Sequence, residues 1–253
     1  MLYIENLSWQ SSKPNMRCCI TIAYDGTDFL GSQAQKSSKN TILGNLETVL
    51  HKLGIDSKII ASGRTDKGVH ATGQVCHFDL PKFWNDIKKL KKVLNEMLPH
   101  TIHVKHIQKV DKEFHARYSA KKRVYRYLIK RGKSNPFEDR FITFLDEIEF
   151  DKVQKNIRLF VGKHDFSYLM KVGSDVKSTV RIVNRAFAYK YKNIIVLNFE
   201  ANGFLRAQIR LMVGALLKLD AKELQEQLDC KKDYKIKPAP SNGLYLTRIN
   251  YAD

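Results

Sequence analysis

Hydrophobic and polar positions along the chain follow two spacings, one typical of helices and the other typical of strands. In residues 41–53 the apolar side chains return every three or four positions, as on the buried face of a helix, and Asn40 or Thr41 can cap its start. In residues 73–80 every second side chain from Cys76 onward is apolar, which is typical of a strand. The chain therefore predicts a mixture of helices and strands.

The first half of the chain arranges these patterns in a definite order. Strands are predicted at 17–24, 56–62, 73–80 and 101–110, and helices at 41–53 and 82–98. One helix follows the first strand and the other follows the third. This β-α-β-β-α-β order is typical of a ferredoxin-like unit.

The second half predicts the same order. Strands are predicted at 118–131, 179–190, 193–201 and 244–251, and helices at 150–161 and 204–219, with a short helix after the latter. We therefore predict an α+β protein with two ferredoxin-like halves built on mixed or antiparallel sheets. The halves are expected at 16–111 and 112–253, after an N-terminal extension at 1–15 that is expected to be flexible. Because no residue-level repeat is visible, the duplication rests on the order of elements alone.

The net charge of the chain indicates a polyanionic partner. Lysine and arginine number 44 against 26 aspartates and glutamates, which gives a net charge of +18. Such an excess favours nucleic acid, although a lysine-rich proteome would also raise the charge. Residues 114–133 hold eight basic residues and no acid, interleaved with tyrosines. Because this stretch alternates like a strand, it does not suit the basic amphipathic helix of a membrane-surface protein.

Composition also bears on the compartment and on cofactors. No apolar run approaches the ~20 residues that a membrane-spanning helix needs, and residues 1–16 lack the basic start and apolar core of a signal peptide. The four cysteines show no zinc spacing. We expect a cytoplasmic protein with reduced cysteines, no metal, no other cofactor and no membrane partner.

The loop at 63–71, Gly-Arg-Thr-Asp-Lys-Gly-Val-His-Ala, is the first candidate for chemistry. An aspartate followed two residues later by glycine is ordinary turn chemistry, and a plain turn is the simpler interpretation. The loop nevertheless crowds together more polar groups than a tight turn needs: Arg64, Asp66, Lys67 and His70.

The predicted helix at 204–219 is the second candidate, because it is apolar on nearly every face and so is expected to be buried. Arg206 and Arg210 lie four residues apart on one side of it. A buried guanidinium needs an anionic partner, since an unpaired one costs several kcal/mol. The alternative is that both arginines reach the surface along their apolar stems.

Two tyrosines share one face of the predicted strand at 118–131, beside Arg123. Tyr125 and Tyr127 are compatible with a core position, which is the commoner place for aromatic residues in strands. Exposed on a basic sheet, they would instead stack on nucleic-acid bases.

These motifs, taken together, resemble the tRNA pseudouridine synthase A family (TruA type), from about residue 17 to residue 251. The loop at 63–71 is similar to the family signature, and further blocks match in order. They are Tyr24-Asp25-Gly26-Thr27-x-Phe29-x-Gly31, Gly73-Gln74-Val75 with His77-Phe78, Asn95 with Leu98-Pro99, Phe114-His115-Ala116-Arg117, Tyr125-Arg126-Tyr127, Gly162-x-x-Asp165-Phe166, Ser178 with Arg181, and Phe204, Arg210, Val213-Gly214 and Gly243-Leu244-Tyr245-Leu246.

The resemblance implies a pseudouridine synthase core around a basic cleft, with roles for particular residues. Asp66 falls on the catalytic aspartate, which acts as nucleophile, and Arg64 resembles the arginine linked to base flipping. Tyr125 falls on the active-site tyrosine that stacks on the target base and is implicated in proton removal. Arg210 falls on the arginine that pairs with the aspartate, which agrees with the need of a buried helix for an anion.

Other substrate contacts are expected from the loop and from the basic stretch. Lys67 and His70 are candidates beside Asp66. Lys121, Lys122 and Arg123 are candidates for holding the RNA backbone.

Two positions depart from the family pattern. Ser32 stands where the family usually has tryptophan, so a flat stacking surface is expected to be missing from that loop. Lys67 replaces a small residue, and a cation there can add a phosphate contact or favour the charged carboxylate.

The resemblance further implies the activity and its partner. The expected enzyme is an isomerase that converts uridine to pseudouridine at positions 38, 39 and 40 of the tRNA anticodon stem-loop and acts as a homodimer. A noncatalytic RNA-binding protein on the same scaffold and a pseudouridine synthase with other RNA targets remain the alternatives.

Overall fold

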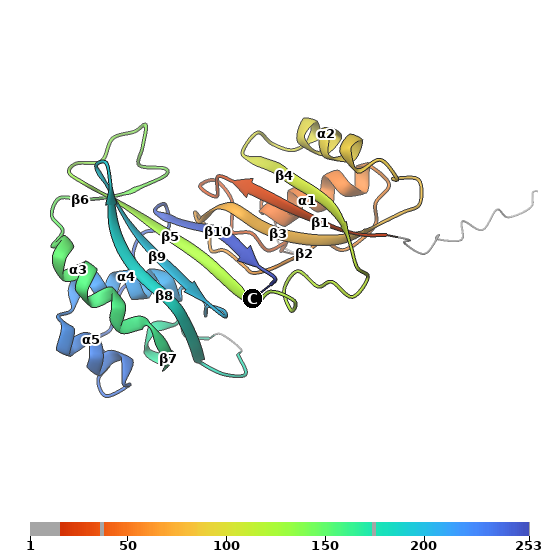
Figure 1. Ribbon diagram of the computed structural model, residues 1–253. Helices are drawn as coiled ribbons and strands as arrows, with labels where there is room; N and C mark the ends of the chain where they lie inside the picture. The colour runs from red at the N-terminus through yellow and green to blue at the C-terminus, as the bar shows by residue number, and fades with distance from the viewer. Residues whose placement is uncertain (1–15, 36–37, 174–175, 253) are drawn as a thin grey trace, which may run out of the picture.

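The computed structural model describes residues 16–35, 38–173 and 176–252, and its strands join into one mixed sheet. The strand order is β4-β1-β3-β10-β5-β9-β8-β7, with β2 paired to β3 and β6 paired to β5. Figure 1 shows the N-terminal half with helices α1 and α2 beside the C-terminal half with α3, α4 and α5. The prediction of an α+β fold is therefore confirmed.

The N-terminal half has the predicted order of elements. These are β1 (Met16–Tyr24), α1 (Ile42–Lys52), β2 (Ile60–Ala61), β3 (His70–Leu80), α2 (Ile87–Met97) and β4 (Ile102–Val110). Its strands lie in the order β4-β1-β3-β2, which is the ferredoxin-like order, and all of these pairings are antiparallel. Thr41 caps α1 by accepting a hydrogen bond from the backbone N–H of Gly44, as predicted from its position.

The C-terminal half repeats that order. Its main elements are β5 (Lys122–Arg131), α3 (Phe150–Asn156), β8 (Val180–Tyr191), β9 (Ile194–Ala201), α4 (Gln208–Lys218) and β10 (Leu244–Asn250). The order β10-β5-β9-β8 is again ferredoxin-like. Additional elements are β6 (Thr143–Leu145), the 3-10 helix η1 (Ile157–Phe160), β7 (Gly162–Asp165), the 3-10 helix η2 (Ser167–Leu169) and α5 (Ala221–Leu228).

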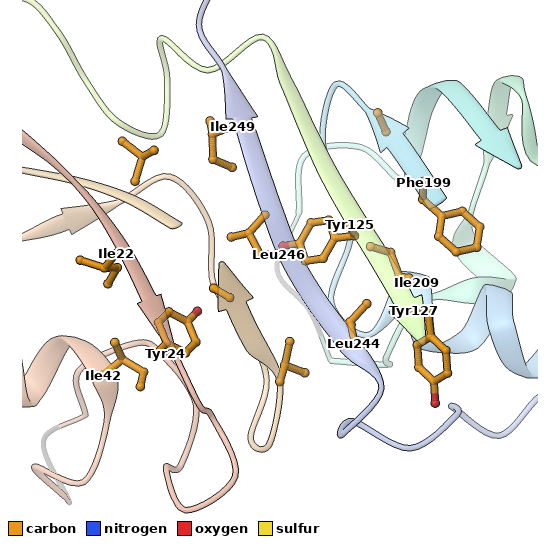
Figure 2. Close-up of a cluster of buried hydrophobic side chains, with 14 of the residues drawn as sticks. Ile22, Tyr24, Ile42, Tyr125, Tyr127, Phe199, Ile209, Leu244, Leu246 and Ile249 are labelled. Atoms are coloured by element: carbon orange, nitrogen blue, oxygen red, sulfur yellow. The ribbon is translucent and has the colours of Figure 1, made fainter. Parts of the chain in front are cut away.

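Strand β10 joins the halves, because it pairs in parallel with β3 and antiparallel with β5. Apolar side chains from both halves meet around it and form one continuous core. Figure 2 shows Tyr24 and Tyr125 on either side of this junction, with Leu246 of β10 beside Tyr125. The junction is therefore a packed part of the core, and it fixes how the two halves lie against each other.

Several predicted boundaries differ from the structure. The strand expected at 56–62 is reduced to the two residues of β2. The helix expected from 82 begins only at Ile87, because Pro81 and Trp84 form a turn and Asp86 caps the helix. The strand expected from 118 begins at Lys122, and the helix expected from 204 begins at Gln208, after Ala207 in the left-handed region at φ 59°.

The expectation of a flexible extension at 1–15 falls outside the described residues. In the part of the chain that is described, no helix has the length and apolar character needed to cross a membrane. All four cysteines are free thiols, and Cys18, Cys19 and Cys76 are buried.

Candidate active site

Asp66 lies in the loop that joins β2 to β3, and this loop rests directly on the segment after β1. A Cβ atom added to Gly26 would lie 2.0 Å from the carbonyl oxygen of Val69. Gly31 has φ +99°, and a Cβ atom there would lie 3.0 Å from the carbonyl oxygen of Thr65. Glycine is required at both positions, because only a residue without a side chain lets the two backbones approach so closely.

The Asp66 carboxylate faces Arg210 of the C-terminal half. Its Oδ2 lies 3.7 Å from Nη1 of Arg210, and the two side chains are 35% and 19% exposed. The turn itself is closed by the backbone, since Val69 N–H donates to the Asp66 carbonyl at 3.1 Å. Among the described residues, the carboxylate makes no hydrogen bond to the turn. A turn-only role for this aspartate therefore does not account for its side chain, and an ion pair between the halves does.

Arg210 is held by the chain segment that follows α5. Its Nε donates to the carbonyl of Ala239 at 2.6 Å, and its own carbonyl accepts from Ala239 N–H at 2.9 Å. Gly214, one turn further along α4, has no room for a Cβ atom, which would lie 2.2 Å from the carbonyl oxygen of Lys237. The segment thus lies flat on the helix, and the guanidinium is fixed before any substrate arrives.

The two arginines that the sequence left undecided have different surroundings. Arg206 precedes α4 and is exposed, whereas Arg210 lies in the first turn and is half-buried against Asp66. The snorkelling alternative therefore describes Arg206, and the ion-pair alternative describes Arg210.

Tyr125 enters the same site from β5. It is 8% exposed, and its ring packs edge-on against Phe204 with centroids 5.4 Å apart. Burial raises the pKa of its hydroxyl, which Arg123 opposes and Asp66 reinforces. In the described part of the chain this hydroxyl has no hydrogen-bond partner. The neighbouring Tyr127 shares a hydrogen bond with Thr143 and donates another to Pro240, so it is a structural core residue.

The pairing of β10 shows which residues share the face of Tyr125. Leu246 pairs with both Tyr125 and Ala71, so those three side chains lie on one face of the sheet. Tyr245 pairs with both Arg126 and His70, so the neighbouring set lies on the other face. His70 therefore lies on the opposite face of the sheet from Tyr125, and its contact with the substrate stays a prediction.

His70 is occupied within the protein. It is 1% exposed, its Nδ1 accepts from Gly26 N–H at 3.1 Å, and its Nε2 lies 2.9 Å from the carbonyl oxygen of Arg140. Its ring stacks on Tyr245 with centroids 4.7 Å apart. Burial lowers the pKa of His70, which the nearby carboxylate of Asp25 opposes. We conclude that His70 fixes the start of β3.

Arg123, which was expected to hold RNA backbone, makes its hydrogen bonds within the protein. Its guanidinium donates to four backbone carbonyls, those of Ser62, Arg117, Ala120 and Asn202. These carbonyls come from the start of the Asp66 loop, from the linker between the halves and from the end of β9. With four donors used in this way, Arg123 joins the two halves, and a contact between Arg123 and phosphate stays a prediction.

The remaining expected contacts stay open to a ligand. Arg64, Lys67 and Lys121 are exposed, and Lys122 is half-buried at the start of β5. No ion pair involves any of these four in the described structure. Their roles in binding remain predictions.

Ser32 was not a candidate from its residue type, and only its departure from the family pattern marked it. The side chain is 1% exposed, and the expected lack of a stacking surface in this loop stays a prediction. Its Oγ accepts from Thr65 N–H at 2.8 Å, and its own N–H donates to the Thr65 carbonyl at 3.1 Å. Tyr24 holds the side chain of Thr65 through a 2.8 Å hydrogen bond between the two hydroxyls.

The described residues include no group of three or more His, Cys, Asp or Glu side chains placed to hold a metal ion. Independence from metal stays a prediction. Among the described residues, the site consists of a carboxylate, a guanidinium and an unpartnered phenol, and this set suits acid–base or nucleophilic chemistry.

Comparison with known proteins shows to which family the chain is similar. A family model described as tRNA pseudouridine synthase matches residues 20–119 and 157–252. Proteins named tRNA pseudouridine synthase A are similar along nearly the whole chain. The one from Campylobacter jejuni strain RM1221 is 40% identical over 93% of this chain and 100% of its own length. Those from Wolinella succinogenes and Helicobacter pylori are 40% and 39% identical over 91% and 93% of this chain, and over 92% and 100% of their own lengths.

A solved structure, the crystal structure of a Cbf5-Nop10-Gar1 complex, aligns with a TM-score of 0.34 at 13% identity, over 79% of this chain and 45% of that one. A likeness of that size adds no support. The family match and the curated relatives do not depend on it, and the chain belongs to the tRNA pseudouridine synthase family.

Proposed function

We propose that this chain isomerises uridine to pseudouridine at positions 38, 39 and 40 of the tRNA anticodon stem-loop, as a homodimer, with Asp66 as its catalytic carboxylate. The observation that carries the proposal is the Asp66–Arg210 pair between the two halves, 3.7 Å apart beside the unpartnered hydroxyl of Tyr125. The tRNA positions and the dimer rest on the family resemblance and on the relatives named tRNA pseudouridine synthase A.

The reaction needs no external reagent. The bond between ribose C1′ and uracil N1 breaks, the base turns, and C1′ joins C5. The proton on C5 leaves and N1 gains a proton, so product and substrate have the same atoms. A carboxylate that is 35% exposed can reach the substrate and act as nucleophile while the glycosidic bond breaks.

Arg210 and Tyr125 prepare the carboxylate and the base. The guanidinium lies 3.7 Å from the carboxylate and is itself fixed by Ala239. Because burial raises the pKa of Tyr125, its hydroxyl keeps its proton at neutral pH. The tyrosine therefore stacks on the base and offers a hydrogen bond, and removal of the C5 proton through it requires a group that takes the hydroxyl's own proton.

Binding supplies the energy that takes the uridine out of its stack, which costs a few kcal/mol. The net charge of +18 attracts the RNA backbone, and the exposed Arg64, Lys67 and Lys121 are candidates for phosphate contacts. Arg64 lies two residues from Asp66, so a phosphate held there would bring its own nucleotide to the carboxylate.

The test is to map pseudouridine in tRNA after conversion by the wild-type chain and by Asp66→Asn, which keeps the size of the side chain but removes its charge. We expect wild type to modify positions 38 to 40, and Asp66→Asn to lose several orders of magnitude in rate while its tRNA affinity stays near normal. More than about a tenth of the wild-type rate in Asp66→Asn, a loss of only ~1.4 kcal/mol in the barrier, would refute the assignment.

The same assay separates the alternatives. Tight tRNA binding with no pseudouridine formed by the wild-type chain would indicate a noncatalytic RNA-binding protein. Conversion of other RNAs but not of these positions would indicate different targets. Sedimentation equilibrium of the same preparation tests the dimer, and a single species of about 29 kDa would contradict it.

A further inference from the structure

Ser32 lies under the residue that precedes Asp66 and makes a reciprocal pair of hydrogen bonds with it. The Ser32 Oγ accepts from Thr65 N–H at 2.8 Å, and Ser32 N–H donates to the Thr65 carbonyl at 3.1 Å. The serine is 1% exposed and the threonine 7% exposed, so water does not compete for either bond. Both backbone polar groups of Thr65 are thereby fixed.

The pair also ties the Asp66 loop to the start of α1. The Ser32 carbonyl accepts from Leu43 N–H at 2.9 Å, and the Gly31 carbonyl accepts from Ile42 N–H at 3.3 Å. Ile42 and Leu43 are the first two residues of that helix and are buried. The loop is therefore attached through one serine to an element that cannot move without disturbing the core.

Asp66 needs such support because its partner does not fix it. The 3.7 Å separation from Arg210 is longer than a hydrogen bond, so the ion pair attracts the carboxylate without setting its orientation. The backbone of the loop must set it instead. A Cβ atom on Gly31 would lie 3.6 Å from the carbonyl carbon of Asp66, which shows how directly the loop rests on this segment.

We propose that Ser32 is a positioning residue for Asp66: its hydroxyl holds the Thr65 peptide and thereby aims the carboxylate at the substrate. The proposal rests on the proposed function. Ser32 does not touch the substrate, since it is buried under the loop, and it acts only through Thr65. A displacement of about 1 Å in a reacting group is enough to cost about a hundredfold in rate, so loss of one buried acceptor is measurable.

The experiment compares Ser32→Ala with Ser57→Ala. The Ser57 hydroxyl also accepts from a backbone N–H at 2.8 Å, that of Asp79, at the opposite end of β3 from Asp66. Each variant removes one such bond. We measure the single-turnover rate of pseudouridine formation at saturating enzyme, the tRNA dissociation constant, and thermal melting.

We expect Ser32→Ala to lose about tenfold or more in single-turnover rate, with a tRNA dissociation constant within about twofold of wild type. Ser57→Ala should keep the wild-type rate while its melting temperature falls comparably. Equal rates in the two variants, or a Ser32→Ala defect that lies wholly in tRNA affinity, would overturn the proposal.

Ser32→Cys serves if Ser32→Ala does not fold. A thiol is of similar size and accepts hydrogen bonds only weakly, so the rate should fall with normal affinity, and an unchanged rate would overturn the proposal. Wild type and Asp66→Asn are run alongside. If wild type forms no pseudouridine, or if Asp66→Asn stays active, the proposed function has failed. If both controls behave as expected and Ser32→Ala matches Ser57→Ala, only the positioning role has failed.

Discussion

The two halves share one order of elements but differ where their second strand meets their third. In the N-terminal half, β2 has only two residues, and an eight-residue connection at 62–69 follows it before β3 begins. In the C-terminal half, β8 has twelve residues and turns into β9 through Lys192 and Asn193 alone. The same position in the fold is thus a loop that carries a carboxylate in one half and a tight hairpin with no chemistry in the other.

This difference shows how a repeated scaffold can give an asymmetric site. The N-terminal half contributes Asp66 from a loop, and that loop must be held from outside by Ser32. The C-terminal half contributes Tyr125 from a strand and Arg210 from a helix, elements that are rigid by their own hydrogen bonds. A carboxylate on a loop held from outside therefore faces two groups on regular elements, and the predictions below perturb each side in turn.

Arg210→Ala should have the largest effect. Removing a fixed charge aimed at a reacting group costs about a hundred- to a thousandfold in rate, and the Asp66 carboxylate would lose its only ion-pair partner in the described structure. Single-turnover rates measure it. Arg206→Ala is the matched control, because Arg206 lies four residues earlier and is exposed. A similar loss in both variants would mean that the two arginines bind RNA rather than that Arg210 serves Asp66.

Arg123→Met should have the next largest effect, which is a loss of folding stability. The four carbonyls that accept from its guanidinium belong to both halves and to the linker. Loss of hydrogen bonds to a charged donor costs ~1.5–3 kcal/mol, which is about 3–12 °C in melting temperature for a protein of this size. Arg126→Met, on the opposite face of β5 and exposed, should melt within about 2 °C of wild type. Equal melting of the two variants would show that the guanidinium does not join the halves.

How far the sequence predicts the molecule depends on the range of the interactions involved. Local patterns sufficed for α1, whose apolar spacing and Thr41 cap are both confirmed. They failed at β2, where propensity favoured a strand over 56–62 but only Ile60 and Ala61 pair with β3. The start of α4 was also missed, because Ala207 takes a left-handed conformation that its residue type disfavours.

The site shows the same limit. Residue type made Asp66 and Arg210 candidates but left a plain turn and a surface arginine as alternatives, and their pairing was implied by the resemblance to the family. The face of His70 could not be predicted, because it depends on β3 beginning three residues earlier than expected and on its register with β10. Nor could the sequence show that Arg123 differs in its contacts from Lys121 and Lys122, since its four acceptors come from segments up to 79 residues away.

Replacing Lys121 and Lys122 together should give a smaller effect, and only on the affinity for tRNA. If each neutralises one phosphate, replacing both with alanine lowers the slope of log affinity against log salt by about two, and leaves melting nearly unchanged. Lys88→Ala with Lys89→Ala on α2, both exposed, removes the same charge from the other half. Equal slopes for the two double variants would show that net charge, and not this basic stretch, sets the salt dependence.

The smallest effect is expected at the hairpin that stands opposite the Asp66 loop in the repeat. Lys192 has φ +53°, a conformation that costs a side chain about 1 kcal/mol and that glycine adopts freely. It is the first central residue of a two-residue β-hairpin turn, where a positive φ favours glycine. Lys192→Gly should therefore raise the melting temperature by about 2–4 °C at most, because relief of strain is partly offset by the greater freedom of the unfolded chain. Its single-turnover rate should equal that of wild type, since no residue of this hairpin belongs to the site.

The contrasting change is Gly31→Ala. Lys192→Gly removes a side chain at a positive φ, whereas Gly31→Ala adds one at a positive φ beneath Asp66, 3.0 Å from the Thr65 carbonyl oxygen. That variant should lose rate as well as stability. If Lys192→Gly slowed catalysis as Gly31→Ala does, the two connections would be coupled, and the division between a chemical loop and an inert hairpin would not hold.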